Sequence, residues 1–144
     1  GGGAGGGGAG PPVVPPLDRE TYYATRPRIR AEVEVLAADP AGRVVAVHAP
    51  VAADRETPRG AAARLLRERL GTVRPPGRLL ALDWLPGDRP RLVYVFDGGR
   101  LDRHRPADGA AAAGDRRTTA ALAHRGTASG PLELVDGVPV AGPW

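Results

Sequence analysis

The chain has 144 residues, a formal net charge of +4, an isoelectric point of about 10.5 and no cysteine. This length suits a single domain, and the missing thiols exclude disulfides, thiol catalysis and cysteine-ligated zinc. No apolar run approaches the roughly 18 residues that a membrane-spanning helix needs, so we expect a cytoplasmic protein with no part in a membrane.

All 20 basic residues are arginines, and lysine, asparagine and glutamine do not occur. One interpretation is that a high-GC bacterial genome has placed arginine wherever the solvated surface needs a cation. The other is an affinity for phosphate-rich ligands, because a guanidinium offers a fork of two hydrogen bonds. A nucleic-acid binder is not favoured, since aromatic residues make up only 4% of the chain and no stacking platform is visible.

The first 16 residues, Gly1–Pro16, consist mostly of glycine and proline. Such a segment cannot bury enough apolar surface to offset the entropy lost on ordering, so it predicts a disordered leader. We therefore expect residues 17–144 to form the single domain.

Two strands are predicted after this leader. The segment Arg28–Leu36 alternates between apolar and charged residues, which is typical of a half-buried strand. The residues expected on its buried face are Ile29, Ala31, Val33 and Val35. Those expected on its exposed face are Arg28, Arg30, Glu32 and Glu34. A proline-glycine turn and the apolar segment Arg43–His48 follow, so the two strands are predicted to form a hairpin.

The stretch Glu56–Thr72 predicts the main helix, over Pro58–Leu70. Thr57 can accept a hydrogen bond from a free N–H of the first turn, and Pro58 suits the first helical position. Gly71 is the expected stop. Residues four apart form the expected buried stripe, which consists of Ala62, Leu66 and Leu70.

Shorter elements are expected further along, each bounded by turn or capping residues. They are strands over Arg78–Leu85 and Arg91–Phe96, a turn at Asp97–Gly99, a helix over Arg116–Arg125 with Asp115 as N-cap, and a hairpin around Asp136 and Gly137.

The segment Pro50–Thr72 resembles the signature of the Nudix (MutT-like) hydrolases. That signature reads Gly, five residues, Glu, seven residues, then Arg-Glu-aliphatic-x-Glu-Glu-x-Gly-aliphatic. The flanking TYYATRPR, PGRLLALDWLPG and VYVFDGGRLD look like an actinobacterial-type branch of this family. The resemblance covers roughly Thr21 to Val140, and it implies an α/β fold (an α+β sandwich) with the helix Pro58–Leu70 on one face of a mixed sheet. The matching positions are Glu56, Arg64, Leu66, Glu68 and Gly71.

The resemblance implies hydrolysis of a pyrophosphate bond in a nucleoside-diphosphate-linked substrate, with Mg²⁺ or Mn²⁺ held by clustered glutamates. Leu65 and Arg69 stand where two of these glutamates are expected, so only Glu68 remains as a possible metal ligand. Mg²⁺ requires several oxygen ligands, and we therefore expect metal binding to be weak or absent and hydrolysis to be impaired. The loop Ala49–Arg55 is also shorter than its family counterpart. Pro50 and Thr72 are the two other departures from the signature.

The other candidate residues have more limited roles. By resemblance, Glu56 and Arg64 form a structural ion pair that ties the loop to the helix. Arg69 is a candidate ligand for a phosphate, with Arg64 or Arg67 contributing less; alternatively, Arg69 only extends into solvent. The histidines lack metal-ligand spacing. These are His48, His104 and His124.

Three functions thus stay open. The first is an impaired hydrolase of a nucleotide-like small molecule. The second is a catalytically silent module that binds a ligand or a partner. The third and least favoured is an arginine-rich nucleic-acid binder. The sequence does not predict an oligomeric state.

Overall fold

The structure is a computed structural model that describes residues 29–103, 115–127 and 129–140. The predicted leader Gly1–Pro16 and His104 lie outside the described residues. Within them the chain is an α+β protein, and neither helix is long and apolar enough to cross a bilayer. Its elements are β1 (Arg30–Ala38), β2 (Val44–Pro50), α2 (Pro58–Glu68), β3 (Leu79–Leu85), β4 (Arg91–Arg100), α3 (Arg116–His124), β5 (Leu132–Val135) and β6 (Val138–Pro139).

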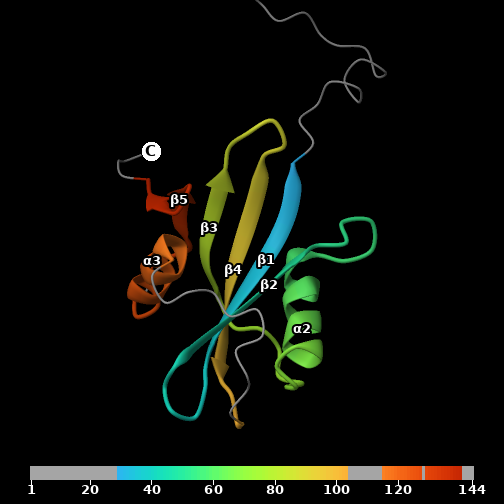
Figure 1. Cartoon of the computed structure of the whole chain (residues 1–144), viewed down its shortest axis with the longest axis vertical. Helices are drawn as coiled ribbons and strands as arrows, with labels where there is room; N and C mark the ends of the chain where they lie inside the picture. Colours follow the sequence, from blue (N-terminus) through green and yellow to red (C-terminus); the bar gives the residue numbers. More distant parts are fainter. Residues whose placement is uncertain (1–28, 104–114, 128, 141–144) are drawn as a thin grey trace, which may run out of the picture.

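The strands form one mixed sheet in the order β2-β1-β4-β3-β5-β6. The hairpin neighbours β1 and β2 are antiparallel, as are β3 and β4, whereas β1 and β4 run parallel. The two helices lie on opposite faces of this sheet (Figure 1). Because side chains alternate along a strand, β1 supplies both cores: Val33 and Val35 belong to the α2 side and Leu36 to the α3 side.

The expected half-burial of β1 is wrong at Glu34. This side chain was predicted on an exposed face, yet it is only 2% exposed. The reason is that α3 covers the second face of the sheet and brings Arg117 and Thr118 to the Glu34 carboxylate. The strand also begins later than predicted. Ile29 was expected on the buried face, but it precedes β1 and is exposed.

The helix α2 begins as predicted and ends two residues earlier than predicted. The Thr57 hydroxyl accepts from the Gly60 N–H at 3.0 Å, and Pro58 occupies the first turn. The helix ends at Glu68, and Arg69 is its C-cap. Gly71 follows with a φ of +67°, a left-handed conformation that favours glycine. Leu65, expected beside the buried stripe, is itself in the core.

The predicted turn at Asp97–Gly99 is wrong, because β4 continues through these residues to Arg100. The pairing with β1 shifts register opposite this segment, and Gly99 has a φ of +72°. A Cβ on Gly98 would lie 2.7 Å from Val35 Cγ1, so only glycine fits there without movement. The sequence Asp-Gly-Gly therefore forms an irregularity within a strand and not its end.

The helix and the hairpin predicted for the C-terminal part are both present, and α3 ends at His124, one residue earlier than predicted. Asp115 caps α3 by accepting from the Arg117 N–H at 2.9 Å. Asp136 and Gly137 both have positive φ angles, 50° and 77°, and they connect β5 to β6 as an antiparallel pair. A turn with two positive φ angles matches the twist of a tight hairpin, which explains the choice of Asp-Gly.

Candidate functional site

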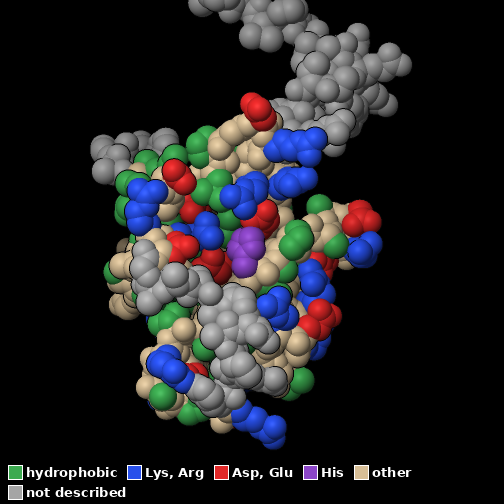
Figure 2. Space-filling view, viewed as in Figure 1, with side chains coloured by type: hydrophobic (Ala, Val, Ile, Leu, Met, Phe, Trp, Pro, Cys, Tyr) green, Lys and Arg blue, Asp and Glu red, His purple; other side chains and the backbone are tan. Residues whose placement is uncertain are grey.

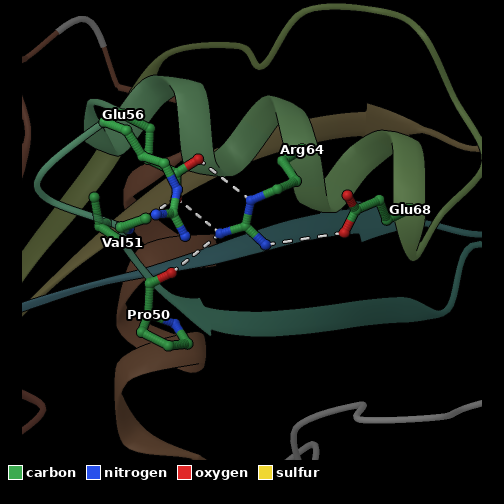
Figure 3. A pocket seen from close by; sticks show the side chains of 7 residues that line it. Pro50, Val51, Glu56, Arg64 and Glu68 are labelled. Carbon is green, nitrogen blue, oxygen red and sulfur yellow. Dashed lines mark hydrogen bonds and ion pairs between the residues drawn. The ribbon is translucent and has the colours of Figure 1, made fainter.

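The junction between β2 and α2 is held by Glu56 and Arg64 (Figure 3). Arg64 donates to the two Glu56 carboxylate oxygens at 2.8 Å and 3.2 Å. The same carboxylate accepts from the Ala52 N–H at 2.9 Å, and Arg64 also donates to the Pro50 carbonyl. Thus one ion pair fixes both the loop and the end of β2 against the helix.

These contacts shift the pKa of both groups in the direction that favours the charged form. Hydrogen bonds from Arg64 first, and then from the Ala52 N–H, lower the pKa of Glu56 to about 2. The hydrogen bond to Glu56 in turn raises the pKa of Arg64. Glu56 is therefore ionised throughout the neutral range and is committed to its partner. A carboxylate in this state is a poor general base, because its proton affinity is far below that of a group matched to neutral pH.

An open pocket of about 490 Å³, which we call the Glu56 pocket, lies beside this pair. Glu68 reaches it from the last turn of α2, and its carboxylate lies 3.9 Å from Arg64 (Figure 3). The lining contains two arginines and two glutamates, so its formal charges balance. Its residues are Pro50, Val51, Ala52, Arg55, Glu56, Arg64 and Glu68.

The residues present do not fit a Mg²⁺ or Mn²⁺ site. Leu65 is 2% exposed and packs in the core, so its position faces away from solvent. Glu68 is exposed and close to a guanidinium, which competes for the same carboxylate. Among the residues that the structure describes, no three Asp, Glu, His or Cys side chains gather as metal ligands. Of the two carboxylates at this place, Glu56 is bound to Arg64, so Glu68 alone is left where such an ion takes several oxygens.

Arg69 is exposed but does not line the Glu56 pocket. It follows the last helical residue, and its backbone N–H donates to the Leu65 carbonyl. Arg64, the first of the two lesser candidates for anion binding, does line the pocket but is already bound to Glu56. Arg67, the second, lies on the opposite flank of the helix, beside another pocket.

The histidines occupy separate environments. His48 lies on β2, and its ring nitrogen is 3.0 Å from the Glu32 carboxylate on β1. His124 ends α3, and its ring contacts the Gly130 carbonyl at 2.6 Å. The two histidines within the described residues thus have different partners.

A buried network on the α3 side of the sheet was missed by sequence reasoning. Arg117 donates to the Glu34 carboxylate at 2.9 Å and to the Asp83 carboxylate at 3.0 Å. Thr118 donates to Glu34, and Asp83 also accepts from the Gly137 N–H. Burial works against the charged guanidinium, but the two carboxylates outweigh it and raise the pKa of Arg117. The signal available in the sequence was Asp83, a single charge inside the apolar strand segment LLALDWL.

Several arginines of the described surface are paired with acids. Basic and acidic side chains are interspersed over the face seen in Figure 2. Arg91 pairs with Glu32 at 3.1 Å, and Arg125 donates to the Asp97 carboxylate. Burial raises the pKa of Asp97, but hydrogen bonds from Arg125 and the Gly99 N–H outweigh it and leave the pKa lowered. This arrangement is typical of a solvated, ion-paired surface.

No family model matches the sequence, and none of the curated proteins does.

Proposed function

We propose that the chain is a catalytically silent Nudix-type module that binds a ligand or partner. The observation that carries this proposal is the state of the three helical positions where the resembled family has its glutamates. Leu65 is in the core, Arg69 is a cation, and Glu68 lies near Arg64. The Nudix-type fold and the cytoplasmic location expected from the sequence are part of the same proposal.

The mixed sheet with α2 on one face is compatible with this fold. The Glu56–Arg64 pair supports it more specifically, since it joins the loop to the helix at the spacing of the signature. A structural pair that is kept beside a depleted metal site is what we expect when a fold is retained for binding and not for hydrolysis.

The alternative function is an impaired hydrolase of a nucleoside-diphosphate-linked small molecule. One observation favours it: the Glu68 side chain is 61% exposed and its carboxylate faces the Glu56 pocket (Figure 3). In this case Glu68 would have to hold Mg²⁺ or Mn²⁺ together with the substrate's own phosphate oxygens.

A metal titration and a turnover assay separate the two functions. The full chain is titrated with Mg²⁺ and Mn²⁺ by calorimetry, and phosphate release is followed on a panel of nucleotide sugars and dinucleotides. We expect no stoichiometric binding at about 1 mM metal and no metal-dependent release, because a single carboxylate is a weak ligand. A metal-dependent activity that Glu68→Gln abolishes would establish the hydrolase instead.

A further inference from the structure

A second pocket lies on the other flank of α2 from the Glu56 pocket. It has a volume of about 420 Å³ and opens between the helix and the segment of residues 73–76. We call it the Arg67 pocket. Arg59 and Arg67 reach it from the helix, and Arg74 reaches it from the segment that follows. Its volume falls within the range of roughly 300–1,000 Å³ that is typical of sites for small molecules.

The two pockets differ in charge. Three arginines and no acidic residue line the Arg67 pocket, whereas the arginines and glutamates of the Glu56 pocket balance. Within the described part of the chain, neither Arg67 nor Arg74 forms an ion pair; Arg74 Nε lies 3.4 Å from the Thr72 hydroxyl. Uncompensated cations in a concave site attract anions, so charge complementarity selects a negatively charged ligand.

Arg59 differs from the other two arginines because it is fixed. Its guanidinium donates to the Pro76 carbonyl at 3.1 Å and to the Gly77 carbonyl at 2.8 Å. It also stands over the Phe96 ring, 4.9 Å from the ring centre. These contacts attach the segment to α2, so the wall of the pocket is held in place while Arg67 and Arg74 remain exposed to a ligand.

The rest of the lining is largely apolar. Val73 is 89% exposed, the largest exposed fraction among the large hydrophobic side chains in the described residues. Pro75 and Pro76 follow it, and their fixed φ angles restrict the segment. Together with Ala63 they give the pocket an apolar part beside its cations, so a ligand with one anionic and one apolar part matches the lining.

We propose that the Arg67 pocket binds a small organic phosphate, with the phosphate held by Arg67 and Arg74 and the organic group packed against Val73. A phosphate carries up to two negative charges and accepts bidentate hydrogen bonds from guanidinium groups, so it needs no metal here. This site is separate from the Glu56 pocket, and it stands or fails independently of the Nudix-type function proposed above.

The test uses 1-naphthyl phosphate and inorganic phosphate as probes, titrated by calorimetry in excess EDTA. Both should bind with one-to-one stoichiometry, and the naphthyl compound should bind more tightly, because only it can cover Val73. Arg67→Ala and Arg74→Ala should each weaken binding at least about tenfold, which is the loss expected for a hydrogen bond to a charged group. Both side chains are exposed, so the folded state should survive, as the melting temperature will show.

Two further variants make the test specific. Arg89→Ala removes the same charge from the loop between β3 and β4, away from either pocket, and should leave binding within about twofold. Arg69→Ala tests the anion role predicted from the sequence, and it should also have little effect. The proposal is overturned by equal losses in all four variants, by a loss confined to Arg69→Ala, or by no saturable binding of either probe at about 10 mM.

Discussion

Arg117 compensates two buried carboxylates at once, and its removal should be the most damaging single change on the α3 side of the sheet. Glu34 is 2% exposed and Asp83 is 1% exposed, while the Arg117 side chain itself is 15% exposed. The substitution Arg117→Met keeps a side chain of similar length and high helix propensity. Its main effect is therefore to remove the positive charge and its hydrogen bonds.

Breaking a buried ion pair by removing one partner costs about 3–5 kcal/mol, because the other charge remains without compensation. Here two carboxylates are left, so we expect a loss at the upper end of this range. That loss is a large part of the roughly 5–15 kcal/mol of a typical domain, and the melting temperature should fall by about 10 °C or more.

The assay is urea unfolding followed by circular dichroism, with Arg116→Met as the matched control. Arg116 is the neighbouring helix residue; its side chain is 67% exposed and lies 3.9 Å from the Asp136 carboxylate, an exposed pair worth about 1 kcal/mol or less. Equal losses for the two variants would refute the argument.

Three further changes test the α2 side. The pKa of Glu56 is lowered from 4.5 to about 2, so Glu56→Gln should destabilise the chain at neutral pH, and urea titrations should show this difference disappearing as the pH falls through that interval. Gly98→Ala should cost about 1–3 kcal/mol by thermal unfolding, because the new Cβ would meet Val35; Gly130→Ala, which meets nothing within 4 Å, is the control. Leu65→Glu should lower stability without creating a Mg²⁺ site, because its position is in the core; a Mg²⁺-dependent rise in melting temperature would contradict this.

The elements that the sequence predicts well are those fixed by local hydrogen bonds. The Thr57 cap, the Asp115 cap and the Asp136–Gly137 turn each depend on atoms no more than a few residues apart. Local spacing was therefore enough to find these three features. The Glu56–Arg64 pair is also local, with partners 8 residues apart, but it was expected from the resemblance to the Nudix signature and not from spacing.

The failures share a different cause, since each depends on a partner far along the chain. Glu34 alternates with apolar residues and reads as exposed, but its partner Arg117 is 83 residues away on a helix that covers the second face of the sheet. The Asp97–Gly99 segment was predicted as a turn, because aspartate and glycine occur both in turns and at irregular positions within strands. The close packing of Val35 against Gly98, which distinguishes the two, is a contact between distant parts of the chain. Neither fact is encoded in a local window.

The two candidate sites, the Glu56 pocket and the Arg67 pocket, lie on different flanks of α2. Compared with the signature that it resembles, the chain has Leu65 in this helix and Arg69 at its C-cap where two glutamates are expected. The same helix that gathers cations in the resembled family thus carries an excess of positive charge here. Glu56 and Glu68 cancel that excess on one flank, whereas Arg67 and Arg74 on the other flank have no ion-pair partner among the described residues. An anionic ligand would therefore bind in the Arg67 pocket and not at the position of the Nudix signature. The spacing of helix residues does not predict this pocket, because Arg74 reaches it from outside the helix.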